Sequence, residues 1–343
     1  MLALRKILPQ PGGLSLDEIA MPQAGPGEIC IEIAYGGICG TDLHLYHWSP
    51  FMRYARLPVV LGHELAGRVV EIGAGVTRAA VGDRVTVDSH IPCGRCYACL
   101  NEAAHVCENT RYPGIHINGG FASHVVLPER IVWKLHDSLP DEIGTIMEPF
   151  GIAVHASTAA TGVAGQNVVI SGCGPIGLMN VAVARALGAN RVIALDVNAL
   201  RLQAAERLGA DAILNPADID AVKEIRQMTR GSGTDVFVEY SGVASSLALA
   251  GEALAYGGQL RLLAVPENAG NTDFSKWVMK GLTIQGLHGR RFFSTWLLAT
   301  KLLIDRKLDI RPVISDIVPL KQAPAAFEAA AAGQALKILI SPR

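Results

Sequence analysis

From about residue 150 to residue 287, short apolar runs alternate with helix-forming segments, and this alternation limits the possible folds more than any other feature. The run NVVISGCG precedes PIGLMNVAVARALGA, RVIALD precedes NALRLQAAERLGA, and AILN precedes DIDAVKEIRQMT. The segments DVFVEYSG, SSLALAGEALAYGG and QLRLLAV continue the pattern. Such a strand–helix alternation predicts an α/β fold with a doubly wound parallel sheet that is covered by helices on both faces.

The first strand–helix turn carries a glycine pattern that is typical of dinucleotide-binding sites. Gly172, Gly174 and Gly177 form G-x-G-x-x-G, with Pro175 and Ile176 between the last two glycines. The first glycine permits a tight turn, the second lets the backbone approach a pyrophosphate, and the third permits close packing of helix on strand. Free N–H groups at the start of the helix also favour phosphate. We predict that these five residues bind a dinucleotide cofactor.

Asp196 ends the next predicted strand, 19 residues after Gly177. A carboxylate at this place accepts hydrogen bonds from the ribose hydroxyls and repels a 2′-phosphate, which favours NAD over NADP. The alternative is that Asp196 only caps the following helix. Arg201, about one helical turn further on, is a candidate contact of the adenosine, and the alternative is a solvent-exposed arginine on the helix surface.

Another pattern lies in the first part of the chain, where Cys93, Cys96, Cys99 and Cys107 form C-x2-C-x2-C-x7-C. Cysteines this close along the chain cannot easily form two unstrained disulfides. Four thiolates in one loop can instead surround a tetrahedral Zn²⁺ and leave it no open position, which is typical of a structural site. Reduced surface thiols are the alternative, but they do not explain the spacing. The pattern therefore predicts a structural zinc.

The composition argues against several classes of function. The chain has 343 residues, a formal net charge of -1, 50% hydrophobic residues and 18% charged residues. A near-neutral chain without blocks of like charge is not expected to bind nucleic acid. We also expect no membrane span and no signal peptide, because no apolar run has the required length or flanks. Three further cysteines show no pairing pattern, so a reducing, cytoplasmic location is expected.

A separate group of possible metal ligands consists of Cys39, His63 and Glu64, which lie beside glycines in GGICGTD and LGHE. A soft thiolate and an imidazole suit Zn²⁺, and three protein ligands leave a position open for a substrate oxygen. Glu148, just before the nucleotide-binding half, is a further candidate ligand. The alternative is that Cys39 is a small buried residue and His63 a hydrogen-bonded core histidine.

The two ends of the chain have a different character from its middle. Residues 1–135 contain short runs typical of strands, such as EICIEIAY, AGRVVEIG, GDRVTV and FASHVVL, and these predict an antiparallel, barrel-like region. After residue 289 the alternation stops, and a helix at 292–306, a helix AAFEAAAAG and a last strand ALKILIS are predicted. This tail is too short for a separate domain, so we expect it to pack onto the first region.

These features together resemble the zinc-containing medium-chain dehydrogenase/reductases over essentially the whole chain. The residues that carry the resemblance are Gly62-His63-Glu64-x2-Gly67, Cys39-Gly40-Thr41-Asp42, the four-cysteine loop, Gly82-Asp83-Arg84-Val85 and the glycine pattern. Within the family, CGTDLHLYHW, SHIPCGRC, MEPFGIAVH, DVNALRL and KGLTIQGLHGRRFFSTW are most similar to the branch that oxidises L-threonine. The resemblance implies a GroES-like catalytic domain at 1–150, a Rossmann NAD-binding domain at 151–287, and a return of 288–343 to the catalytic domain.

The resemblance also implies roles for single residues. The residues expected around a catalytic zinc are Cys39, His63, Glu64 and Glu148, with Glu148 or Glu64 exchanging with water or substrate. Thr41 and His44 are expected to relay a proton, and Arg290 falls in a segment that lies between cofactor and substrate in similar enzymes. His90 is expected near the site, in contact with substrate or packed behind the ligands. Two zinc ions per subunit and a homotetramer are implied as well.

The implied reaction is the oxidation of L-threonine to 2-amino-3-oxobutanoate, with hydride transfer to NAD. Two residues depart from that branch, because Ile152 stands in place of Asn and His288 in place of an aromatic residue, and both affect the expected substrate pocket. A polyol or 2,3-butanediol dehydrogenase is the alternative within the family, and a non-catalytic nucleotide- or zinc-binding protein is the alternative outside it. Trp48 and Arg53 are candidate substrate contacts, with a packing or surface role as the alternative.

Overall fold

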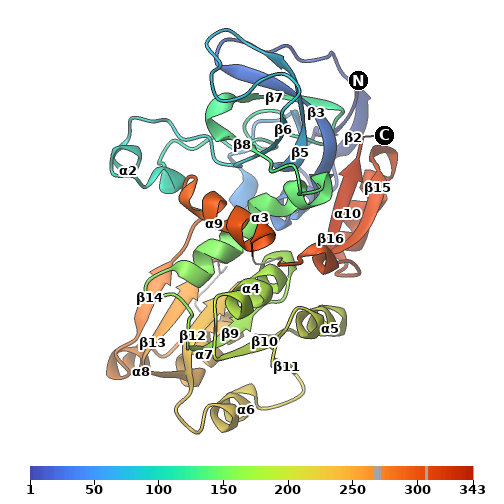
Figure 1. The fold of residues 1–343 in the computed structure, drawn as a ribbon. Coiled ribbons are helices and arrows are strands. Elements are labelled where there is room, and N and C mark those ends of the chain that lie inside the picture. Colours follow the sequence, from blue (N-terminus) through green and yellow to red (C-terminus); the bar gives the residue numbers. More distant parts are fainter. Residues whose placement is uncertain (266–269, 271, 306–307, 343) are drawn as a thin grey trace. The chain divides into compact units, whose positions relative to one another are not determined.

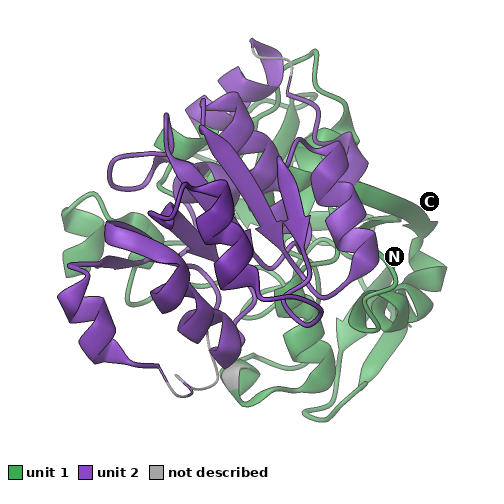
Figure 2. Ribbon diagram, turned by 90° about the horizontal axis from the view of Figure 1, so that it is seen from below, with its two compact units in different colours: residues 1–149, 291–296, 314–343 green, residues 150–290, 297–313 purple. Residues whose placement is uncertain are grey.

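The computed structural model describes residues 1–265, 270, 272–305 and 308–342. The chain forms two compact units, which are coloured separately in Figure 2. Unit 1 consists of residues 1–149, 291–296 and 314–343, and unit 2 consists of residues 150–290 and 297–313. In the described part of the chain, no helix is both long enough and apolar enough to cross a membrane.

Unit 1 is built on a seven-stranded sheet and a three-stranded sheet (Figure 1). The larger sheet has the order β15-β16-β3-β5-β6-β8, and β7 also pairs with β3. Its strands are β3 (Glu28–Gly37), β5 (Glu64–Ile72), β6 (Arg84–Val87), β7 (His124–Pro128), β8 (Val132–Lys134), β15 (Ile314–Pro319) and β16 (Lys337–Ser341). The smaller sheet has the order β2-β1-β4, with β1 (Leu2–Lys6), β2 (Leu14–Glu18) and β4 (Val59–Val60).

The pairing in unit 1 is antiparallel except between β15 and β16. Alternation along β3 explains its place at the centre of the larger sheet, because Ile29, Ile31 and Ile33 pack together with Leu65 and Val85 in one buried cluster. The helices of the unit are short: α1 (Gly40–His47), η1 (Pro50–Met52), α2 (Tyr97–Leu100), η2 (Ala104–Val106), η3 (Glu129–Ile131), η5 (Leu320–Gln322) and α10 (Ala323–Ala331).

Unit 2 contains a six-stranded, fully parallel sheet with the order β11-β10-β9-β12-β13-β14. Its strands are β9 (Asn167–Ser171), β10 (Arg191–Leu195), β11 (Ala212–Leu214), β12 (Thr234–Glu239), β13 (Leu254–Leu262) and β14 (Thr283–Gly286). The intervening helices are α4 (Pro175–Ala186), α5 (Ala199–Arg207), α6 (Ala221–Met228), α7 (Ala244–Ala253) and α8 (Phe274–Met279). Numbered within the unit, the order is 3-2-1-4-5-6, the arrangement of the Rossmann fold.

The core of unit 2 follows the strand register. Val169, Ile193, Phe237 and Leu260 lie opposite one another on adjacent strands and belong to one buried cluster. Strands buried on both faces have nearly continuous apolar sequences, as in NVVIS of β9. The strand order reverses its direction between β9 and β12, and ligands of open parallel sheets bind at such a switch point. The glycine-rich turn follows β9 and therefore lies at this place.

The fold confirms the predicted class, a β-rich domain combined with a Rossmann domain. The last strand of the chain, β16, joins the larger sheet of unit 1 beside β3, as the short tail led us to expect. Two details differ from the sequence interpretation. Helix α3 (Asp141–Thr158) continues through the change of pattern near residue 150, with Pro149 inside it.

The second difference concerns residues 297–313, which belong to unit 2, although the sequence prediction assigned all of 288–343 to the catalytic domain. Helix α9 (Ser294–Ile304) begins in unit 1, where Trp296 Nε1 donates to Asp88 Oδ2 at 2.9 Å. The short helix η4 (Arg311–Val313) packs against α4 and α5 of unit 2. The assignment therefore depends on packing that an apolar helix pattern alone does not reveal.

Candidate active site and metal centres

The four cysteines of the C-x2-C-x2-C-x7-C loop converge in unit 1. Their sulfur atoms all lie within 4.8 Å of one another, and Cys96 Sγ is 3.7 Å from Cys107 Sγ. All four are free thiols. Sulfur atoms around a tetrahedral zinc, each at about 2.3 Å from the metal, are about 3.8 Å apart. The loop therefore has the donor set and the sulfur spacing of a closed zinc site.

Backbone N–H groups point at these sulfur atoms. Cys93 N donates to Cys107 Sγ at 3.2 Å, Asn109 N donates to the same sulfur at 3.3 Å, and Arg95 N donates to Cys93 Sγ at 3.5 Å. The N–H of Arg95 is the main reason that the pKa of Cys93 is lowered to about 6. Because zinc binds thiolates, these donors prepare the loop for a cation.

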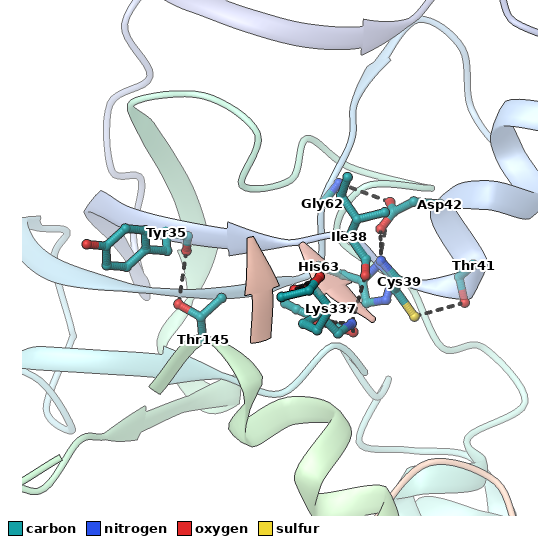
Figure 3. Close-up of polar contacts among 11 residues, drawn as sticks. Tyr35, Ile38, Cys39, Thr41, Asp42, Gly62, His63, Thr145 and Lys337 are labelled. Carbon is teal, nitrogen blue, oxygen red and sulfur yellow. Dashed lines mark hydrogen bonds and ion pairs between the residues drawn. The ribbon is translucent and has the colours of Figure 1, made fainter. Parts of the chain in front are cut away.

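Cys39, His63 and Glu64 form the second cluster of possible ligands. Figure 3 labels Cys39 and His63 of this cluster. Cys39 is the N-cap residue of α1, and His63 and Glu64 lie at the start of β5. The sulfur, the ring nitrogen and a carboxylate oxygen all lie within 4.8 Å of one another. Strand β3 leads into α1 and pairs with β5, with Gly37 opposite Glu64, so the sheet brings the two segments together.

Asp42 connects the two turns that carry these ligands, as Figure 3 shows. Its Oδ2 accepts a hydrogen bond from Cys39 N at 3.0 Å, and its Oδ1 accepts one from Gly62 N at 3.3 Å. The same Oδ1 is 3.9 Å from Nδ1 of His63, and the Asp42 side chain is fully buried. The sequence analysis recorded Asp42 only as part of the CGTD turn. An acidic residue at the third position of a helix that follows a small N-cap residue is the signal that would have identified it.

Lys337, at the start of β16, is a second residue that the sequence analysis did not identify. Its Nζ donates to Glu64 Oε1 at 2.8 Å and to Glu64 Oε2 at 2.7 Å, and the exposed fractions of the two side chains are 2% and 0%. A third donation goes to Ile38 O at 2.7 Å. The available signal was a lysine inside the apolar strand ALKILIS, since a lysine is almost never buried without a partner.

The charges around His63 favour a cation. Burial lowers the pKa of this imidazole, but the negative charges of Cys39, Asp42 and Glu148 outweigh burial and raise the pKa to about 10. Glu148 lies in α3 with a side chain that is almost fully buried, and its charge also acts on Glu64 and Lys337. A divalent metal can supply the positive charge instead of the proton, and sulfur, nitrogen and oxygen ligands together suit Zn²⁺.

The two residues expected to relay a proton both lie on α1. Thr41 Oγ1 is 3.8 Å from Cys39 Sγ, so this hydroxyl is beside the candidate metal ligands (Figure 3). His44 is exposed to solvent one turn further along the helix. A half-buried hydroxyl next to the ligands and an exposed imidazole on the same helix have the chemistry of a route from site to solvent.

Three other residues named from the sequence lie in unit 1. His90 is buried, with its Nδ1 3.3 Å from Asp88 Oδ1 and from Ser89 Oγ. Trp48 packs against the core cluster that contains Leu45, and the ammonium of Lys6 lies 5.6 Å from the centre of its ring. Arg53 is exposed on the surface. The contacts of Trp48 are those of a packing residue.

The glycine-rich turn of unit 2 joins β9 to α4. Gly172 has φ +90, and a Cβ atom on Gly177 would lie 2.0 Å from the carbonyl oxygen of Gly172. A Cβ atom on Gly174 would meet no atom within 4 Å, so the backbone is open there. Pro175 and Ile176 begin α4, whose N-cap residue Gly174 offers no side-chain acceptor to the first N–H groups. These N–H groups can therefore bind phosphate oxygens.

Asp196 follows β10 and lies beside this turn. Its Oδ2 accepts a hydrogen bond from Cys173 N at 2.7 Å, and its Oδ1 accepts one from Asn198 N at 2.9 Å. The N-cap of α5 is Asn198, whose side chain accepts from Leu200 N and Arg201 N, so Asp196 is not the helix cap. Arg201 Nη1 is 3.7 Å from Asp196 Oδ2. This pair places a carboxylate and a guanidinium next to the glycine-rich turn.

Arg290 is completely buried in unit 2, close to α3. A Cβ atom on Gly151 would lie 2.7 Å from Cδ of Arg290, so only glycine leaves room for this side chain. Ile152, the neighbour of Gly151 in α3, is half-buried, and His288 is exposed. His155 of the same helix has its Nδ1 3.0 Å from Gly289 O, which holds the segment before Arg290 against α3.

Two family models match the chain. Residues 25–137 match an alcohol dehydrogenase GroES-like domain, and residues 175–305 match a zinc-binding dehydrogenase domain. The chain is 41% identical to an L-threonine 3-dehydrogenase of Pyrococcus furiosus, covering 92% of this chain and 90% of that protein. It is 40% identical to an L-threonine 3-dehydrogenase of Symbiobacterium thermophilum, covering 100% and 98%.

Solved structures share the complete fold. The 2R,3R-butanediol dehydrogenase of Bacillus subtilis is 29% identical, with a TM-score of 0.91 over 100% of this chain and 99% of that chain. Together with the family models and the full-length relatives, this similarity agrees with the β-rich and Rossmann units described above. The chain therefore belongs to the zinc-containing medium-chain dehydrogenase/reductase family of alcohol dehydrogenases.

Proposed function

We propose that this protein oxidises the secondary alcohol of L-threonine to give 2-amino-3-oxobutanoate, with hydride transfer to NAD. The observation that carries the proposal is the cluster of Cys39, His63 and Glu64 with the Thr41 hydroxyl beside it. Full-length relatives named L-threonine 3-dehydrogenase support the choice of substrate. We further propose that the cluster, with Glu148, holds a catalytic zinc and that the four-cysteine loop holds a second, structural zinc.

The chain's own residues account for the movement of the proton. Zinc in such a cluster acts as a Lewis acid that lowers the pKa of an alcohol, and NAD accepts a hydride. Thr41 Oγ1 then accepts the hydroxyl proton of the substrate while its own proton passes on toward His44, because it is the hydroxyl beside the ligand cluster. His44, exposed on the same helix, returns a proton to solvent near neutral pH. Asp42 keeps Cys39 and His63 in place during this transfer.

We propose NAD rather than NADP as the cofactor because of Asp196. Its carboxylate directly follows β10 and lies beside the glycine-rich turn, where a 2′-phosphate would meet a like charge. Gly172, Gly174, Pro175, Ile176 and Gly177 would bind the pyrophosphate, Arg201 would contact the adenosine, and Arg290 would be a further contact of the cofactor. Parallel assays with NAD and NADP measure the preference directly.

A substrate panel tests the reaction. L-threonine, sorbitol, 2,3-butanediol and simple secondary alcohols are compared at equal concentration, and the absorbance of NADH is followed. We expect the highest kcat/KM with L-threonine. Fast oxidation of a polyol or of 2,3-butanediol without turnover of L-threonine would reject the proposed substrate and leave the reaction class intact. The diol is the second candidate, because Ile152 and His288 depart from the threonine branch and the solved butanediol dehydrogenase has the same fold.

We also propose a homotetramer located in the cytoplasm. Among the described residues, no strand pairs with the outer edge of the terminal strand β14. Ile284 on this strand, like Val278 and Met279 of α8, is an exposed apolar residue. All seven cysteines are free, as expected in a reducing compartment.

Light scattering after size-exclusion chromatography gives the subunit number, and a metal count gives the expected two zinc ions per chain. One zinc per chain would remove the catalytic-zinc proposal.

A further inference from the structure

Lys6, the last residue of β1, is completely buried and carries its charge into the core of unit 1. Its ammonium donates to three neutral acceptors, Gln10 O and Gly12 O at 2.6 Å each and Tyr46 O at 3.4 Å. Burial lowers the pKa of Lys6 to about 8, so the ammonium keeps its proton at neutral pH. A buried charge needs such partners, and this one ties the loop between β1 and β2 to the end of α1.

Tyr46 lies in the last turn of α1, where the carbonyl groups have no partner inside the helix. Its carbonyl oxygen also accepts a hydrogen bond from Gly12 N at 2.9 Å. A positive charge at the carboxyl end of a helix is favourable, because the helix dipole is negative there. Lys6 and Gly12 together therefore attach the last turn of α1 to the first strands of the chain.

Trp48 follows α1 in a conformation that is unusual for a bulky residue. Its φ is 52 and its ψ is 49, the left-handed conformation in which glycine commonly ends a helix. Trp48 N donates to Leu45 O at 3.2 Å, and Ser49 N donates to His44 O at 3.0 Å. The indole ring packs against the core cluster of Leu45, and the ammonium of Lys6 lies 5.6 Å from its centre, within the range of a cation–π contact. Lys6 thus supports the strained residue that ends α1.

The first turn of α1 is held by other contacts. Asp42 accepts hydrogen bonds from Cys39 N and from Gly62 N, so the end of the helix beside the metal ligands does not depend on Lys6 (Figure 3). His44 lies in the last turn and is exposed. A change at Lys6 is therefore expected to displace His44 and to leave the ligand cluster in place.

We propose that Lys6, with its ammonium against the Trp48 ring, is a positioning residue that fixes the last turn of α1 and keeps His44 where it accepts the proton that comes from Thr41. This inference rests on the proposed function, because it assumes that His44 returns the proton to solvent. It extends the proton route by a residue that touches neither substrate nor metal.

The variant Lys6→Met removes the ammonium and keeps an unbranched side chain of similar length. Proton release to solvent during the first turnover of L-threonine is followed with a pH-indicator dye in a stopped-flow instrument, and NADH absorbance is recorded in parallel. A positioned acid–base group typically contributes 10²–10⁴-fold, and a displaced one loses part of this, so we expect proton release to become about tenfold slower. The zinc content should not change, because the ligands lie at the other end of α1.

A double-mutant cycle with His44→Gln separates positioning from a general loss of structure. If Lys6 acts through His44, Lys6→Met/His44→Gln releases the proton as slowly as His44→Gln alone. A Lys6 that only stabilises the fold would slow both backgrounds by the same factor. The conservative variant Lys6→Arg keeps a cation under the Trp48 ring and is expected to recover most of the rate.

Lys280→Met is the matched control. Lys280 is also a buried lysine whose ammonium donates to backbone carbonyl oxygens, but in unit 2, where its acceptors are those of Gly251, Glu252 and Leu254. Its replacement removes a buried ammonium without touching α1. We expect Lys280→Met to release the proton at the wild-type rate.

Two results would overturn the inference. If Lys6→Met releases the proton at the wild-type rate, or if its effect persists in full in the His44→Gln background, Lys6 does not position His44. If Lys6→Met does not fold, Trp48→Gly gives the decision, because glycine keeps the left-handed end of the helix and removes the ring beside Lys6. Slower release that disappears in the His44→Gln background then supports the inference, and the wild-type rate contradicts it.

Failure of the proposed function gives a different pattern. If His44→Gln itself releases the proton at the wild-type rate, the proposed proton route is wrong and the inference falls with it. If His44→Gln is slow and Lys6→Met is not, the route stands and only the role of Lys6 is rejected.

Discussion

Replacing Asp42 by Asn tests whether one carboxylate organises the candidate catalytic metal site. Asp42 accepts hydrogen bonds from Cys39 N and from Gly62 N, and it lies 3.9 Å from His63. The amide of Asn can accept at only one of its two ends, so one of the two N–H groups loses its partner. A buried group without a hydrogen-bond partner costs about 1–3 kcal/mol, and we expect a loss of folding free energy of this size.

Metal binding should weaken as well, because the substitution removes a negative charge beside His63 and loosens the two turns that carry the ligands. Residues that support metal ligands typically contribute 10–100-fold to affinity, so we expect zinc to bind about 10–100-fold less tightly at the second site. Competition with a chelator gives the zinc affinity, and chemical denaturation gives the stability. The steric change is minimal, because Asn has nearly the same shape as Asp.

Asp83→Asn is the matched control for this experiment. Asp83 also accepts one backbone hydrogen bond, from Ala80 N at 3.0 Å, and pairs with Lys134 at 2.6 Å, but it lies near the surface of unit 1. A surface ion pair contributes about 0–1 kcal/mol, so the control should lose little stability and no zinc affinity. If Asp42→Asn binds zinc and unfolds as the wild-type protein does, the carboxylate does not organise the site and our reasoning about the two turns is wrong.

The remaining predictions concern the other parts of the chain. Gly177→Ala should both lower the thermal unfolding temperature and weaken NAD binding, because the added methyl group would lie 2.0 Å from a carbonyl oxygen. Gly174→Ala should leave stability unchanged, because a Cβ atom there meets no atom within 4 Å. Equal unfolding temperatures for both variants would contradict this prediction. Cys96→Ser should reduce stability or assembly before turnover, and a stable, fully assembled variant without activity would show that the two zinc sites are assigned wrongly. Asp196→Ala should reduce the preference for NAD over NADP, measured as a ratio of kcat/KM, by about tenfold or more. The reason is that like charges about 5 Å apart repel by about 3 kcal/mol at an effective dielectric constant of 20. An unchanged ratio would show that other residues determine the preference.

Much of the fold could be predicted because its signals are local. Strands β9 and β10 of the parallel sheet are short apolar runs, and the glycine pattern identifies the turn after β9 at once. Helix α3 was not predicted, since Pro149 interrupts its pattern and the surrounding packing overrides the local preference. Residues 297–313 group with unit 2, whereas the sequence prediction placed them in the catalytic domain, because an apolar helix pattern shows that a face is buried but not against which unit.

The candidate site shows the same division between local and distant information. Cys39 and His63 could be named because a thiol and an imidazole beside glycines, taken together with the four-cysteine loop and the glycine pattern, suggest metal chemistry. The role of Asp42 could also have been predicted, because it lies only three positions from Cys39, the N-cap residue whose N–H it binds. The role of Lys337 could not have been predicted, because its contact with Glu64 depends on the pairing of β16 with β3, two strands from opposite ends of the chain. A lysine in a strand is normally expected at the surface, and only the position of Glu64 explains why this one is buried.

The register of β16 in the larger sheet of unit 1 therefore decides whether Lys337 reaches Glu64 at the candidate metal site. Gly37 of β3 lies opposite both Leu339 of β16 and Glu64 of β5, and Ile38 N donates to Ile338 O at 3.0 Å. A slip of one residue in β16 would turn Lys337 to the other face of the sheet and bury Glu64 without a partner. Breaking a buried ion pair in this way costs about 3–5 kcal/mol, so the pair also selects the correct register. The last strand of the chain can thus reach its place only in the register that completes the candidate active site.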